Sequence, residues 1–249
     1  MFNDKALFNN SIYFPNSFRA IICGKSNCGK TYLLFNFLFN HLDFHNLIIC
    51  STSNQKCYEV LEKCFEAQLP INVIKNIFDN HEIIEDVDEV INDIVNDEDF
   101  EQGEINFQLI KDVAELPSPD DFDRQEKTLI VLDDSAYEKE QTNIEKLFFK
   151  GRHANINVIY ITQSYYRLPK KSIRDNANLL FLFKVKGTDK IHIFNDWVSG
   201  DMTSDEFNKF YSSVCNPKFG FMTISLDDDL DCGRFRKSLD MFYTPNPTT

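Results

Sequence analysis

The sequence predicts an α/β fold with a mostly parallel central sheet flanked by helices. Apolar runs bounded by polar or turn-forming residues recur along the chain, and segments with helical periodicity lie between them. The runs are continuously apolar, which is typical of strands buried on both faces of a parallel sheet. The chain of 249 residues shows no shift in composition that would mark a linker, so we expect a single domain over residues 1–249.

Each expected element follows from its own stretch of sequence. The strands expected from apolar runs are residues 18–23, 47–50, 128–132, 157–162, 179–185 and 219–225. The helices expected from helical periodicity are residues 31–41, 55–67, 86–95, 140–150 and 188–198. The closing residues 219–239 are expected to form a C-terminal hairpin around an acidic turn.

Charge is divided unevenly along the chain. The formal net charge is −13, but residues 79–126 alone contain 18 acidic and 2 basic residues, which leaves 21 acidic and 24 basic residues elsewhere. Residues 146–190 carry ten basic side chains against two acidic ones. We interpret residues 79–126 as an acidic, insertion-like surface segment, with a partner-docking face as the alternative. The rest of the chain can still present a basic surface to nucleic acid.

Composition limits the class of protein. No apolar run reaches the length of about 18 residues that a membrane span needs, and the residues after Met1 form no signal-peptide pattern. The seven cysteines are odd in number and include no Cys-x-x-Cys pair, so we expect reduced thiols. The protein is therefore expected to be soluble and intracellular, without a membrane partner.

A phosphate-binding loop follows the first expected strand. Residues 24–31 match the pattern G-x-x-x-x-G-K-[ST] and stand between that strand and an amphipathic helix. Glycines let the backbone wrap around phosphate oxygens, and the positive end of the helix attracts them. We expect Lys30 to reach the β- and γ-phosphates of ATP and the Thr31 hydroxyl to ligate Mg²⁺. The expected nucleotide-binding residues are Gly24, Lys25, Ser26, Asn27, Cys28, Gly29, Lys30 and Thr31.

Hydrolysis requires acidic residues on a second strand. Four apolar residues lead into Asp133 and Asp134, about a hundred residues after the P-loop, as in a Walker B element. Asp133 would hold Mg²⁺ through water, and Asp134 would orient or deprotonate the attacking water. The next expected strand runs into Gln163. Because ligands bind at the carboxyl ends of strands in open α/β sheets, Gln163 is expected to sense the γ-phosphate or position water.

The residues around Gln163 carry a family resemblance. The string Gly151-Arg-His-Ala-Asn-Ile-Asn-Val-Ile-Tyr-Ile-Thr-Gln163, continuing through Leu168-Pro and Ile173-Arg-Asp-Asn176, resembles the FtsK–HerA superfamily. Within it the chain most resembles the poxvirus-type genome-packaging ATPases of large DNA viruses and their virophage and transposon relatives. The resemblance covers about residues 18–186. It implies a RecA-like (ASCE) P-loop NTPase fold, a homo-oligomeric ring of five or six subunits, and threading of double-stranded DNA into a capsid.

The resemblance also implies roles for single residues. Lys30 and Thr31 take the P-loop positions, and Gln163 takes the sensor position. Asp133 and Asp134 take the Walker B positions, although the superfamily more often has Glu at the second. The acidic residues 79–126 match no part of the family pattern.

Two arginines are candidates for an arginine finger. Ring ATPases commonly insert an Arg from one subunit into the site of the next, where it stabilises charge on the transferring phosphoryl group. Arg152 follows the helix after the Walker B strand, and Arg174 follows the sensor strand. We prefer Arg152, and a structural ion pair is the alternative for either residue.

A basic loop is the candidate contact with DNA. The basic residues of this loop surround Pro169 and lie beside Tyr165 and Tyr166; they are Arg167, Lys170 and Lys171. Basic side chains interleaved with aromatic ones can follow a phosphate backbone. A solvated surface loop is the alternative.

The P-loop and Walker B residues predict a Mg²⁺-dependent ATP hydrolase, and the family resemblance implies that it translocates double-stranded DNA into a viral capsid. Capsid proteins are expected partners, and the host cytoplasm, in a viral factory, or the virion is the expected location. Two other classes stay open: a P-loop switch that binds ATP to regulate a partner, and a P-loop kinase with a small phosphate acceptor. Asp133, Asp134 and Gln163 suit attack by water, which disfavours the kinase.

Overall fold

The strands and helices are those of a computed structural model that describes residues 11–80, 87–135 and 141–246. The strands are β1 (Arg19–Cys23), β2 (Asn46–Ser51), β3 (Asn106–Ile110), β4 (Thr128–Asp133), β5 (Ile156–Thr162), β6 (Leu179–Leu182), β7 (Met222–Ser225), β8 (Phe235–Lys237) and β9 (Met241–Tyr243). The helices are α1 (Lys30–Asn40), α2 (Lys56–Glu66), α3 (Ile71–Asn80), α4 (Val87–Val95), α5 (Thr142–Lys150), α6 (Gly187–Ile193) and α7 (Ser204–Cys215).

All of these strands join one sheet in the order β3-β2-β4-β5-β1-β6-β7-β8-β9. The six strands from β3 to β6 in this order pair in parallel, and β7, β8 and β9 add to them as antiparallel neighbours. The strand β5 lies between β1 and β4. Because the strands are parallel, the loops that follow β1, β4 and β5 emerge at the same edge of the sheet, where α/β folds bind ligands.

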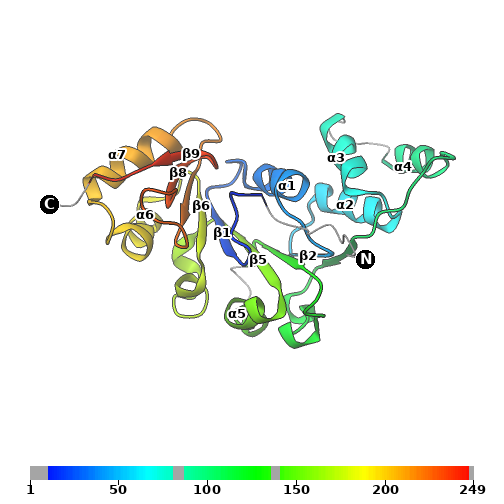
Figure 1. Ribbon diagram of the computed structural model, residues 1–249, viewed down its shortest axis with the longest axis horizontal. Helices are drawn as coiled ribbons and strands as arrows, with labels where there is room; N and C mark the ends of the chain where they lie inside the picture. The colour runs from blue at the N-terminus through cyan, green and yellow to red at the C-terminus, as the bar shows by residue number, and fades with distance from the viewer. Residues whose placement is uncertain (1–10, 81–86, 136–140, 247–249) are drawn as a thin grey trace, which may run out of the picture.

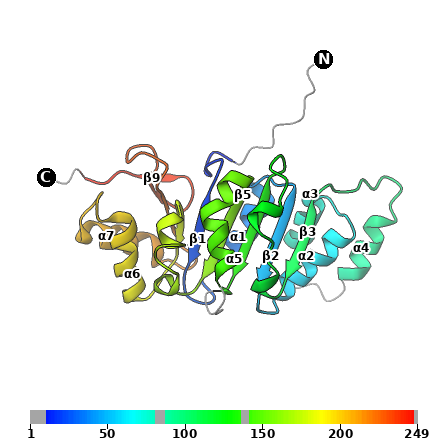
Figure 2. The same cartoon turned by 90° about the horizontal axis from the view of Figure 1, so that it is seen from below.

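Helices cover both faces of the sheet and divide the core into two clusters. One cluster joins the sheet to α1, α2, α3 and α4, which lie above it in Figure 1. The other cluster joins it to α5, α6 and α7; α5 lies below the sheet in Figure 1 and in front of it in Figure 2. The central strands β4 and β5 are buried at every residue, which explains their uninterrupted apolar sequence.

The expected fold class is confirmed, with small shifts in the element bounds. The C-terminal antiparallel strands were expected as a hairpin, and β9 extends them by one strand. The expected strand 179–185 is shorter, because β6 ends at Leu182. The helix expected over residues 188–198 begins at Gly187 as α6 and continues as a π-helix from Phe194 to Val198. Asp86 and Glu140, where two helices were expected to begin, lie outside the described residues.

The acidic residues 79–126 contribute to the sheet, which the sequence analysis did not predict. They contain α4 and the edge strand β3, which pairs in parallel with β2 and places Phe107 opposite Leu47. Phe107 also stacks on Phe65 of α2 with ring centroids 4.9 Å apart. Alternating exposure along β3 is the reason that it was missed, because an edge strand lacks a continuous apolar run. The helices α3 and α7 were also missed.

Candidate functional site

The P-loop connects the carboxyl end of β1 to α1, and its two glycines are required by the geometry. A Cβ atom at Gly24 would lie 2.6 Å from Cys28 Sγ and 2.6 Å from Phe183 Cβ. Gly29 has φ of 101°, in the left-handed region that favours glycine, and caps the N-terminus of α1. The loop backbone is tied to two neighbouring segments, because Gly24 N donates to Thr162 O and Lys25 N donates to Lys184 O, both at 3.2 Å.

Lys30 and Ser26 make the polar contacts of the loop. Lys30 Nζ donates to Gly24 O at 2.9 Å and to Lys25 O at 2.8 Å, so its ammonium group lies across the loop. Ser26 Oγ donates to Gln163 Oε1 at 2.7 Å. This second bond links the P-loop directly to the residue after β5 that the sequence analysis proposed as a sensor.

Asp133 ends β4 and is held by two side chains that the sequence analysis missed. Tyr58 Oη and Gln55 Nε2 each donate to Asp133 Oδ2 at 2.7 Å. Both hydrogen bonds go to the same oxygen. They fix the orientation of the carboxylate and leave Oδ1 for other ligands. Burial raises the pKa of the Asp133 carboxyl above its usual value, while the bonds from Tyr58 and Gln55 and the charge of Lys30 lower it.

Gln55 and Tyr58 lie at the start of α2, just after the carboxyl end of β2. The strand β2 pairs with β4, and Ser51 lies opposite Asp133 in the register. A sequence signal for Gln55 existed, because a polar run from Ser51 to Gln55 follows an apolar strand. Polar residues at that position gather at the ligand-binding edge of a parallel sheet.

Asp134 has a backbone conformation that is uncommon for a residue with a side chain. Its φ is 57°, and its N–H donates to Ile161 O at 3.2 Å. Its Oδ1 is buried without a hydrogen-bond partner within the described part of the chain. A buried carboxylate oxygen without a partner is costly and suggests a ligand or water that completes it.

These residues line one cavity of about 320 Å³ at the carboxyl edge of the sheet. The lining residues include the P-loop, Walker B and sensor positions, namely Ser26, Asn27, Lys30, Thr31, Ser53, Gln55, Asp133, Asp134 and Gln163. A hydroxyl and two carboxylates are hard oxygen ligands of the kind that Mg²⁺ prefers, and Mg²⁺ usually takes only one or two carboxylates together with substrate phosphates. The donor set therefore fits Mg²⁺ bound with a nucleotide, and it contains no cluster of three or more metal-ligating residues among the described ones.

Comparison with known proteins establishes the family. A family model described as "Poxvirus A32 protein" matches residues 5–195, which is more than three quarters of the chain. The chain belongs to the poxvirus A32 protein family. The resemblance to poxvirus-type ATPases that the sequence analysis proposed is thereby confirmed, and no curated protein matches the chain significantly.

Solved structures support the fold of this A32-family chain. It is similar to B204, the DNA-packaging ATPase from Sulfolobus Turreted Icosahedral Virus, with 14% identity and a TM-score of 0.52 over 86% of this chain and 94% of that one. The genome packaging NTPase B204 from Sulfolobus turreted icosahedral virus 2 in complex with ATP-gammaS has 15% identity and a TM-score of 0.49 over 86% and 94%. At this identity the first likeness shows a shared fold.

The two candidate arginines of this A32-family chain lie in very different surroundings. Arg174 is 8% exposed; its Nη1 donates to Asp196 Oδ2 at 3.0 Å, and its guanidinium lies 5.1 Å from the centre of the Tyr165 ring. Arg152 is exposed, and its Nε lies 3.3 Å from His153 Nε2. Arg152 lies four residues before Ile156, the first residue of β5, and β5 pairs in parallel with β1 so that Val158 lies opposite Arg19. Arg152 is therefore at the end of the sheet where β1 begins. That is the edge of the sheet opposite the P-loop.

The loop after Gln163 is anchored in the core by one tyrosine, and its basic side chains are exposed. Tyr165 is fully buried and donates to Asp196 Oδ2 at 3.0 Å, so it is a core residue and not a contact for DNA. Tyr166 is exposed and stacks on His192 with ring centroids 4.8 Å apart. The three basic side chains expected to contact DNA are all exposed: Arg167, Lys170 and Lys171.

No helix in the described part of the chain is long and apolar enough to span a bilayer.

Proposed function

We propose that this A32-family chain hydrolyses ATP with Mg²⁺ and uses the energy to move double-stranded DNA into a viral capsid. The observation that carries the proposal is the cavity in which Lys30, Thr31, Asp133 and Asp134 meet Gln163. Membership of the poxvirus A32 family and the fold shared with a DNA-packaging ATPase support the DNA-moving role. No observation on the described residues specifically favours the alternative roles of a regulatory switch or a kinase.

The chain's own residues would perform the phosphoryl transfer as follows. Asp134 takes a proton from a water molecule, and the water oxygen attacks the γ-phosphorus of ATP. The bond between the γ-phosphorus and its bridging oxygen breaks, so that ADP and inorganic phosphate leave. The orphaned Oδ1 of Asp134 in the cavity supports this assignment, because it is an acceptor without a donor. Gln163, held by Ser26, would orient the same water.

Lys30, Thr31 and Asp133 would hold the substrate. When the nucleotide binds, Lys30 would break its hydrogen bonds to the loop carbonyls and bind the β- and γ-phosphates instead. This movement would make the anion site of the loop accessible to the phosphates. Bound Mg²⁺ would neutralise charge on the β- and γ-oxygens. Asp133, fixed by Tyr58 and Gln55, would hold a water of the metal, and Thr31 would be a direct ligand.

A second subunit would complete the site. Arg152 precedes β5 at the end of the sheet where the parallel strand β1 begins with Arg19, and Cys23 lies at the other end of this five-residue strand. Four steps of about 3.3 Å separate these ends by about 13 Å, so Arg152 cannot serve its own P-loop. An exposed arginine at the edge opposite the P-loop suits a head-to-tail ring, in which each subunit presents different surfaces to its two neighbours. We therefore propose Arg152, and not the buried Arg174, as the arginine finger, in a ring of five or six subunits.

The proposal is tested by the rate of ATP hydrolysis with and without double-stranded DNA, with the mass of the protein measured in the same solution. We expect DNA to stimulate turnover and the active species to be a ring. Lys30→Ala should lose nucleotide binding or turnover, and Asp134→Asn should keep Mg·ATP binding but lose turnover. Turnover that is slow and insensitive to DNA would contradict a motor, and normal turnover in both variants would contradict the site.

A further inference from the structure

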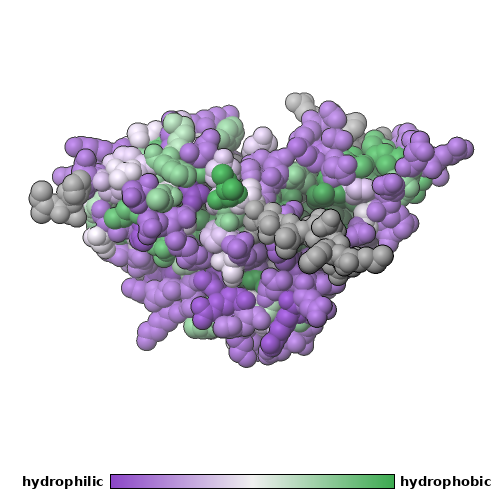
Figure 3. Space-filling model, viewed as in Figure 1, coloured by the Kyte–Doolittle hydropathy of each residue, from purple (hydrophilic) through white to green (hydrophobic). Residues whose placement is uncertain are grey.

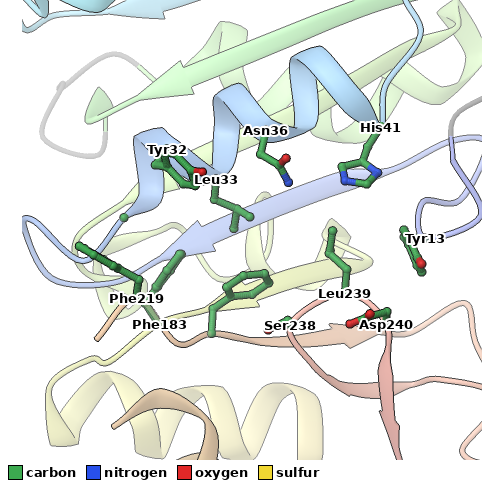
Figure 4. A pocket seen from close by; sticks show the side chains of 12 residues that line it. Tyr13, Tyr32, Leu33, Asn36, His41, Phe183, Phe219, Ser238, Leu239 and Asp240 are labelled. Atoms are coloured by element: carbon green, nitrogen blue, oxygen red, sulfur yellow. The ribbon is translucent and has the colours of Figure 1, made fainter. Parts of the chain in front are cut away.

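A second and larger cavity begins where the P-loop ends. It measures about 770 Å³ and lies between α1 and the segments around β6, β7 and β8. Figure 3 shows apolar side chains at the surface in this part of the molecule. Tyr32, Leu33 and Asn36 enter the cavity from α1, and Phe183 and Phe219 face them from the opposite wall (Figure 4). The volume falls within the range of about 300–1,000 Å³ that small-molecule sites have.

The two cavities meet at the first turn of α1. Gly29 and Tyr32 line the larger cavity, while Lys30 and Thr31 line the catalytic one. Asp133 and Asp134 line the catalytic cavity, and in the proposed reaction the γ-phosphate end of the nucleotide lies beside them. The opposite end of the same nucleotide must leave the P-loop on the other side, where Tyr32 and Phe219 stand.

Asn36 lines the same cavity farther along α1 than Tyr32. Asn36 lies six residues along α1 from Lys30, which is about 9 Å at about 1.5 Å per residue. Asn40 Nδ2 donates to Asn36 Oδ1 at 2.9 Å, so the Asn36 amide group presents its NH₂ as a donor. Figure 4 shows Asn36 pointing into the cavity between Tyr32 and His41. A ring nitrogen of a purine base is an acceptor of the kind that such a donor fits.

Phe219 combines an exposed ring with an uncommon backbone conformation, and the Lys218 ammonium lies 4.8 Å from the centre of its ring. It is 56% exposed, yet its φ is 64°, which is strained for a bulky residue. The turn is fixed by Gly220, where a Cβ atom would lie 2.1 Å from Val214 O. The ring packs on the P-loop, because a Cβ at Gly29 would lie 3.2 Å from Phe219 Cδ1. Strain at an exposed aromatic side chain next to an anion site indicates a role in ligand binding.

We propose that this cavity binds the purine base and ribose of the nucleotide, with stacking contacts from Tyr32 and Phe219 and a donor from Asn36. The assignment rests on the proposed ATPase function and adds the recognition of the base to it. Stacking of a base on an aromatic side chain contributes enough affinity to be measured when the side chain is removed. Binding of the triphosphate alone requires only the P-loop side.

The test measures binding of Mg·ATPγS and of Mg·tripolyphosphate by calorimetry. Phe219→Gly removes the ring and relieves the left-handed φ, so its melting temperature should be no lower than that of wild type. It should weaken ATPγS about fivefold or more and leave tripolyphosphate within about twofold. Asn36→Phe, which fills the cavity, should also weaken ATPγS binding and leave tripolyphosphate binding within about twofold. Phe149→Ala, an exposed phenylalanine of α5 outside the cavity, is the matched control and should change neither ligand.

The outcomes separate the two proposals. If Phe219→Gly and Asn36→Phe bound ATPγS as tightly as wild type, or weakened both ligands equally, the base site would be wrong while the ATPase function stood. If the wild-type chain bound neither ligand, the ATPase function would fail together with the base site. Lys30→Ala should weaken both ligands, because it acts on the phosphates.

Discussion

Replacing Arg174 with alanine is expected to destabilise the isolated chain, while replacing Arg152 is not. The side chains of Arg174 and Asp196 are 7% and 9% exposed, and the two ends of their ion pair are 3.0 Å apart. Removing one partner of a buried pair leaves an uncompensated charge and costs about 3–5 kcal/mol. Lys170 Nζ lies 3.5 Å from Asp196 Oδ1 and can compensate in part, so we expect the lower end of that range.

The cost should be visible in thermal and urea unfolding of the isolated chain. For a chain of this size, 1 kcal/mol corresponds to about 2–4 °C, so a loss of 3 kcal/mol lowers the melting temperature by about 6–12 °C. Arg152→Ala should change stability by no more than about 0.5 kcal/mol, because the side chain is exposed. Asp196→Asn, alone and combined with Arg174→Ala, gives the coupling energy of the pair. An Arg174→Ala variant that unfolds with the wild type would refute a structural role for Arg174.

Three further predictions concern the catalytic and DNA-binding residues. Tyr58→Phe removes one of two hydrogen bonds to the buried Asp133 and should lower the free energy of unfolding by about 1.5–3 kcal/mol. Half-maximal turnover should also require a higher concentration of Mg²⁺, and unchanged urea unfolding would contradict this prediction. DNA binding should weaken linearly in log–log plots against salt, and the slope should fall by up to about 2.7 when three basic residues are changed together to alanine; an unchanged slope would place the DNA elsewhere. These residues are Arg167, Lys170 and Lys171. Arg152→Ala rings should lose about 10³-fold in turnover but regain activity when mixed with Lys30→Ala subunits, and mixtures that stay inactive would contradict a finger in trans.

The sequence predicted that the P-loop, Walker B and sensor candidates lie together, because each of them follows the end of a strand. A parallel strand places the next loop at the ligand edge, so Lys30, Asp133 and Gln163 could be assigned to one place from their positions in the sequence alone. Gln55 and Tyr58 were missed because their contact with Asp133 depends on the register of β2 against β4. Sequence patterns do not give that register.

The remaining differences between the sequence predictions and the structure arise from tertiary contacts. Arg174 and Arg152 are equally basic in the sequence, and only the packing of Asp196 and Tyr165 shows that one of them is buried. The cavity that we propose for the base joins α1 to Phe183 and Phe219, which are separated from α1 by more than a hundred residues of chain. The edge strand β3 within the acidic residues 79–126 was overlooked because its exposure alternates and it lacks a continuous apolar run.

ATP-driven movement along double-stranded DNA is tested most directly by displacement of a third strand annealed in the major groove of a duplex. The assembled wild-type protein should release the third strand with ATP and Mg²⁺. It should not release the strand with ATPγS, and neither should Lys30→Ala or Asp134→Asn with ATP. Hydrolysis that is stimulated by DNA while the third strand stays bound would show an ATPase that does not travel along the duplex, and it would contradict the proposed motor.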